Sequence, residues 1–197
     1  SSAASDVYKR QIQIDMGVSD RGVDLIGDNV DCVLRGGQIT DQSLIARHVG
    51  DLQIGVYVAP SYVERLGAPA HPRELQNTDH CIVGFLSSRT SKIDPLVLCS
   101  ENERIEITGN YVLAVDDGNA YHEAGLVGLG VIALPNYMAA AHQAVGALIP
   151  LFTQWRISPM PLYLAFPRNR HVNAKLRVFI DWIVEVMLQH VPIANNQ

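Results

Sequence analysis

Three glycines near the middle of the chain have a spacing that suggests phosphate chemistry. Gly125, Gly128 and Gly130 are close enough in sequence for a dinucleotide-binding turn. Such a turn needs a strand, then the glycines, then a helix whose N-terminus points at the anion. Here the glycines follow a predicted helix and precede a predicted strand. We therefore interpret them as residues that end a helix and allow close packing.

The other side chains that could do chemistry form no recognisable catalytic set. Ser19 lacks the Gly-x-Ser-x-Gly context of a nucleophilic serine, and no pattern names a base for it. Asp116 and Asp117 could form an acid pair, but adjacent residues usually point apart, so helix capping is the expected role. His80 and Cys81 lack the paired partners of a zinc site. The sequence therefore predicts no metal and no cofactor.

Composition narrows the functional classes further. The 197 residues suffice for one large or two small domains, and 48% of them are hydrophobic. The 15 basic and 20 acidic residues give a net charge of −5, which argues against nucleic-acid binding by this chain itself. No apolar run reaches the roughly 18 residues of a membrane helix, so no membrane partner is expected.

The cysteines and the first residues indicate a cytoplasmic protein. Cys32, Cys81 and Cys99 are too few, and odd in number, for a disulfide framework. Residues 1–11 are polar and unpatterned, without the apolar region of a secretory signal. We interpret them as a tail outside the fold, consistent with an artefact, and residues 191–197 as a second tail.

Strands and helices alternate along most of the chain, which predicts an α/β fold. A period-2 pattern at 12–18, a helix opening at Asp20 and an apolar run at 31–35 indicate a βαβ unit with a parallel sheet. A strand at 54–59 leads into a helix whose Ser61 and Glu64 have capping-box spacing and whose end is set by Gly67. Further strands are expected at 80–85, 105–112, 131–134 and 162–166, and helices at 116–127 and 176–188, the last capped by Asn173.

Many short motifs in one order resemble a known family. They begin with VSDRGVDLI at 18–26, VDCVLRGG at 30–37 and DQSLIARHVG at 41–50. Shorter matches follow: APSY at 59–62, GAP at 67–69, HPREL at 71–75, DG at 117–118, GLG at 128–130, LP at 134–135, FP at 166–167 and RVFID at 177–181. Together they closely resemble the effector-binding domain of LysR-type transcriptional regulators, over about residues 12–190.

The resemblance implies two Rossmann-like α/β subdomains joined by a hinge, similar to type 2 periplasmic binding proteins. Subdomain I would contain 12–58 and 160–190, and subdomain II 59–159. A small-molecule effector would bind between them. Family members also carry an N-terminal winged helix-turn-helix that reads promoter DNA, and they form dimers or tetramers. Neither the helix-turn-helix nor the strand and helix that open the family's effector domain are seen here, so we expect a fragment. The missing strand and helix should leave an apolar face uncovered.

The resemblance also implies which residues contact the effector. They are Ser19, Arg35, Gly36, Ile39, Leu86, Ser87, Asp116 and Asp117. The Ser19 hydroxyl and the amides after it could hold an anion. Arg35 could clamp a carboxylate, but an ion pair with Asp31 or Asp41 is an equal alternative. The two aspartates would repel a dianion, which favours a neutral, monoanionic or amine-bearing effector.

Two other functions stay open at this point. A free-standing solute-binding protein would need a signal peptide, which the sequence does not show. A small enzyme on an α/β scaffold would need a convergent acid, base or nucleophile set, which is not visible either.

Overall fold

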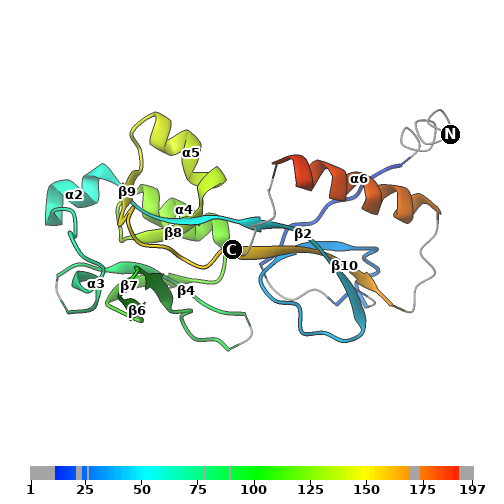
Figure 1. Ribbon diagram of the computed structural model, residues 1–197, viewed down its shortest axis with the longest axis horizontal. Coiled ribbons are helices and arrows are strands. Elements are labelled where there is room, and N and C mark those ends of the chain that lie inside the picture. The colour runs from blue at the N-terminus through cyan, green and yellow to red at the C-terminus, as the bar shows by residue number, and fades with distance from the viewer. Residues whose placement is uncertain are drawn as a thin grey trace. The chain divides into compact units, whose positions relative to one another are not determined.

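A computed structural model describes residues 12–20, 24, 25, 27–77, 79–88, 90–168 and 174–190 (Figure 1). Its contacts divide the chain into two compact units. Unit 1 takes its described residues from 1–18, 23–52 and 159–197, and unit 2 from 19–22 and 53–158. The strand at residues 54–58, which the sequence analysis assigned to the first subdomain, therefore has its contacts within unit 2.

Unit 1 is built on a three-stranded antiparallel sheet in the order β1-β10-β2. The strands are β1 (Val33–Gly36), β2 (Leu44–Leu52) and β10 (Met160–Pro167). The long helix α6, Ala174–His190, lies on β2. It buries Leu176, Ile180 and Val184, which share one helix face because they are spaced by four residues. The final helix is thus confirmed, while its predicted cap, Asn173, lies outside the described residues.

The alternating segment at residues 12–18 forms no strand, so that prediction was wrong. Its apolar residues Ile14, Met16 and Val18 are 55%, 83% and 82% exposed. A period-2 pattern produces a strand only when a neighbouring strand binds its backbone, and the sheet of unit 1 takes all three of its strands from elsewhere in the chain. The predicted parallel sheet is therefore wrong for unit 1. The helix expected after Asp20 falls partly outside the described residues, and 27–29 form a turn.

Unit 2 contains three small sheets. One is antiparallel in the order β8-β3-β9, one is the parallel pair β4-β7, and one is the antiparallel hairpin β5-β6. The strands are β3 (Ile54–Val58), β4 (Ile82–Phe85), β5 (Leu96–Cys99), β6 (Arg104–Ile107), β7 (Tyr111–Val115), β8 (Ile132–Pro135) and β9 (Ile149–Leu151). The helices are α2 (Pro60–Leu66), α3 (Glu74–Asn77), α4 (Gly118–Leu126) and α5 (Asn136–Ala144).

Local signals correctly located the end of α2 but not its beginning. Gly67 follows the helix with φ of 79°, a left-handed value that favours glycine. The capping box was wrong: the N-cap is Ala59, which has no side-chain hydrogen bond, and Pro60 occupies the first turn. Proline suits that position because its fixed φ matches the helix and its missing N–H is not needed there.

The glycines in the last turn of α4 and just after it serve packing, as interpreted from the sequence. A Cβ on Gly125 would lie 2.1 Å from Cδ1 of Ile132, so α4 approaches β8 closely only because this side chain is absent. A Cβ on Gly130 would lie 2.6 Å from the carbonyl carbon of Ile82. Gly128 has φ of 78° just after the helix. The core beneath α4 is apolar and contains Tyr57, Val83, Tyr121, Ala124, Ile132, Leu134, Ala139 and Leu148.

Candidate functional site

Four of the predicted effector residues lie at neighbouring strand ends in unit 2. Leu86 and Ser87 follow β4, and Asp116 and Asp117 follow β7. The two strands are parallel, and the Leu86 amide donates to the Val115 carbonyl over 2.7 Å. The carboxyl ends of parallel strands are where α/β proteins commonly bind ligands, because loops and helix N-termini converge there. The structure therefore brings these four residues to one edge.

The N-terminus of α4 opens at the same edge and is capped twice by carboxylates. Asp117 is the N-cap, and its Oδ1 accepts a hydrogen bond of 2.8 Å from the Ala120 amide. The Gly118 amide donates to Oδ2 of Asp20 over 2.6 Å, across 98 residues of sequence. Helix N-termini attract negative charge because their first amides lack backbone acceptors. The capping role expected for the Asp116–Asp117 pair is thus confirmed for Asp117.

The sequence analysis did not include Asp20 among the site residues. It expected Asp20 to cap a helix that follows it directly in sequence. Its contact with Gly118 places the neighbouring Ser19 at the α4 N-terminus as well. Ser19 and Asp20 are both exposed. No local signal could have found this contact, because its two partners are far apart in the chain and no spacing rule connects them.

The edge presents mainly acceptors and negative charge. Asp20, Asp116 and Asp117 contribute three carboxylates, and all three residues are exposed. The Ser87 amide is already used by the Lys92 carbonyl over 2.9 Å. Carboxylates bind amines, hydroxyls and hard cations. Among the described residues, however, no group of three or more His, Cys, Asp or Glu side chains is arranged to hold a metal ion.

The other three predicted residues belong to unit 1. Arg35 is exposed on β1, and Gly36 ends that strand, where a Cβ would meet the flexible end of Met160. Ile39 follows and is half-buried. The ion pairs seen among the described residues do not include Arg35, and Asp41 instead accepts hydrogen bonds from Ser43. The alternative pairing of Arg35 with Asp41 is therefore not observed.

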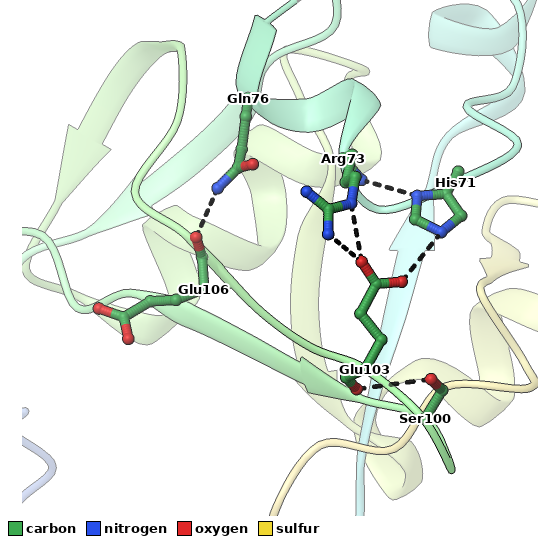
Figure 2. Close-up of polar contacts among 6 residues, drawn as sticks. All are labelled: His71, Arg73, Gln76, Ser100, Glu103 and Glu106. Carbon is green, nitrogen blue, oxygen red and sulfur yellow. Dashed lines mark hydrogen bonds and ion pairs between the residues drawn. The ribbon is translucent and has the colours of Figure 1, made fainter.

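A second polar cluster, shown in Figure 2, fastens the turn between β5 and β6 to the residues before α3. Oε1 of Glu103 accepts from both Nε and Nη2 of Arg73, and its Oε2 lies 3.7 Å from Nε2 of His71. The Arg73 amide donates to Nδ1 of His71. Arg73 is exposed and the other two residues are half-buried, so solvent screens the pairing, which is worth little energy and serves to position the hairpin.

A hollow in unit 2 is lined by residues other than those of this edge. It has a volume of about 230 Å³ and is lined by β3 and residues 150–157, with Asn136 at its rim. Its polar contact is the Tyr57 hydroxyl, which donates to Asn136 Oδ1 over 2.8 Å. Its lining contains none of the predicted effector residues, so the hollow gives them no support.

Comparison with known proteins places most of the chain in one group. A family model described as the LysR substrate binding domain matches residues 9–188. An HTH-type transcriptional repressor of Pseudomonas aeruginosa is 29% identical over 183 residues, covering 93% of this chain and 57% of the relative. An HTH-type transcriptional regulator of Xanthomonas campestris is 31% identical over 176 residues, covering 88% of this chain and 51% of the relative. The chain thus spans little more than half the length of these relatives.

Solved structures agree with this grouping. The regulatory domain of CrgA, a LysR-type transcriptional regulator from Neisseria meningitidis, has a TM-score of 0.76 and 25% identity, covering 94% of this chain and 90% of that one. The regulatory domain of AphB from Vibrio vulnificus has a TM-score of 0.70 and 23% identity, with 94% and 89% covered, and supports the fold alone. Within the described residues, no helix is long and apolar enough to cross a membrane.

Proposed function

Because the chain belongs to the LysR substrate-binding domain family, we propose that it is the effector-sensing part of a DNA-binding transcription regulator. The relatives are HTH-type regulators, which favours this function over a free-standing solute-binding protein. Promoter DNA would be read by a helix-turn-helix outside this chain, whose own charge of −5 is unsuited to phosphate contacts. The protein would act in the cytoplasm, without catalysis, as a homodimer or tetramer.

The effector would contact the edge of unit 2 formed by Ser19, Leu86, Ser87, Asp116 and Asp117. The single observation that carries this assignment is the convergence of the ends of β4 and β7 with the N-terminus of α4. Arg35, Gly36 and Ile39 of unit 1 stay predicted effector contacts that rest on the family resemblance.

The charges at this edge favour an effector that is not a dianion. Asp20 already places a carboxylate on the first amide of α4, where an anionic ligand would otherwise bind. Asp116 and Asp117 add two further negative charges. An amine or a hydrogen-bond donor is attracted by this arrangement, whereas each added negative charge on the ligand is repelled. We therefore propose a neutral or amine-bearing effector, with a monoanion as the less favoured class.

Three probes of graded charge test this proposal on the 197-residue chain. Benzylamine, benzoate and succinate differ in charge from +1 to −2, and each is titrated in a thermal-shift assay at low salt. Benzylamine should raise the melting temperature most and succinate least, because a ligand that binds the native state stabilises it by mass action. A largest shift with succinate would contradict the proposed chemistry.

Variants then test the location of the site. Asp116→Asn and Ser19→Ala should each weaken benzylamine binding, measured by calorimetry, by about two- to fivefold, the range expected for an exposed charged contact. Glu101→Gln is the matched control, since it removes one exposed carboxylate from unit 2 away from the edge. If both site variants stay folded and bind as the control does, the site assignment is wrong.

A further inference from the structure

Two histidines from different helices of unit 2 lie in ring contact. His122 of α4 and His142 of α5 have ring centroids 4.7 Å apart in a T-shaped arrangement, with an interplanar angle of 65°. The His122 side chain is only 15% exposed, and its Nε2 is buried without a hydrogen-bond partner among the described residues. A buried polar atom without a partner is uncommon in native structures and calls for an explanation.

The surroundings of this pair are almost free of charge. The strands packed against α4 are β3, β4, β7 and β8, and they contain no Asp, Glu, Lys, Arg or His. From α5 the facing group is His142, and from α4 itself it is Glu123, whose carboxylate is 71% exposed and lies 3.9 Å from Nδ1 of His122. A proton added to either ring is therefore close to one solvated carboxylate, that of Glu123, and to no charged side chain of the packed strands.

The burial of His122 and the scarcity of charge around the two rings both favour the uncharged form of the pair. Burial lowers the pKa of His122, and the neighbouring His142 lowers it further, while Glu123 acts in the opposite direction. A charged imidazolium at Nε2 would have lost its water without gaining an acceptor. A second proton on His142 would place two positive charges within one ring contact. The neutral rings can instead pack edge to face with no such penalty.

We propose that the His122–His142 contact is a pH-sensitive joint that holds α5 against α4 while both rings are neutral and loosens it in mild acid. The native state of this unit binds fewer protons than the unfolded chain once the pH falls below about 6.5, the ordinary value for histidine. Stability that is full above that pH is then lost as the pH falls toward the lowered value in the folded protein. Loosening α5 would uncover the core around Ala139 and Leu148.

The joint can be measured in the unaltered 197-residue chain. Histidine Cε1–H signals followed by NMR from pH 8 to pH 5 should show His122 titrating with a pKa below its ordinary value. Hydrogen-exchange protection of the α5 amides, corrected for intrinsic rates, should fall over the same interval. Titration of His122 at its ordinary value, with constant α5 protection, would overturn the proposal.

Variants give a second, independent readout. In urea unfolding, the equilibrium constant for unfolding of the parent should rise as the pH falls from about 6.5. The rise should be up to about tenfold per pH unit for each proton that the unfolded chain binds and the native state does not. His142→Gln should reduce this slope, because it removes the second charge from the pair. Asn119→Ala, which changes an exposed residue of α4 that does not titrate, should leave the slope unchanged. Equal slopes in both variants, or abolition of the parent's slope by EDTA, which would indicate a bound metal instead, would overturn the proposal.

Discussion

Replacing Asp20 by alanine tests the long-range cap at the proposed effector edge. Its carboxylate accepts a hydrogen bond of 2.6 Å from the Gly118 amide, while Asp117 caps the Ala120 amide separately. Loss of a helix cap costs about 0.5–2 kcal/mol, and a charge near a helix N-terminus contributes about 0.3–1 kcal/mol. Because Asp20 is exposed and screened by solvent, we expect a loss near the middle of these ranges, about 1 kcal/mol.

Hydrogen exchange at α4 is the direct assay for this loss. A change of about 1 kcal/mol is roughly a fivefold change in an opening equilibrium, so the Gly118 amide should exchange about fivefold faster in Asp20→Ala. The melting temperature should fall by about 2–4 °C for a chain of this length. Asp28→Ala is the control, because it removes an exposed carboxylate that belongs to unit 1 and not to the unit that contains α4.

The same variant should also change ligand preference. With Asp20 removed, the first amide of α4 loses its internal acceptor and one negative charge leaves the edge. Benzoate should then bind more tightly than to the parent, and the gain should shrink as salt is added. If Gly118 exchange and benzoate affinity match those of the Asp28→Ala control, Asp20 does not cap α4 in solution and the argument about effector charge fails.

Two further substitutions test the packing that holds α4 in place. Gly130→Ala should destabilise unit 2 by at least about 1–3 kcal/mol in urea unfolding, because its Cβ would lie 2.6 Å from the backbone of Ile82, whereas Gly17→Ala, in open space, should change stability by less than about 0.5 kcal/mol. Tyr121→Phe should cost about 1 kcal/mol, since it leaves the half-buried Ala133 amide without the hydroxyl that accepts its hydrogen bond. Burial raises the pKa of Tyr121 to about 12, so its phenolate absorbance should appear only near that pH; equal stability of Tyr121→Phe and the parent would contradict this account.

Patterns that depend on near neighbours in sequence were the ones that predicted structure well. The glycines around the end of α4, the Asp117 cap and the four-residue apolar spacing on α6 are each set within about one or two helical turns. The helix α5 was not predicted, because it buries little besides Ala139 and so lacks a strong apolar stripe. The strand β2 was also missed, since much of it is only half-buried or exposed and its pairing with β10 involves residues more than a hundred positions away.

At the candidate site, too, the sequence pattern was informative about near neighbours but not about a contact between residues far apart in the chain. The family resemblance suggested Ser19 as an anion contact, because a hydroxyl followed by the first amides of a helix commonly binds anions. In the structure, the first amide of α4, that of Gly118, donates instead to the carboxylate of the adjacent Asp20, which lies 98 residues earlier in the chain. An acidic side chain of the protein itself therefore occupies the position that an anionic ligand would take. A ligand carboxylate would have to displace that side chain and then face Asp116 and Asp117 as well. The long-range contact therefore argues against the anion that Ser19 alone would suggest, and it agrees with the repulsion of a dianion expected from Asp116 and Asp117.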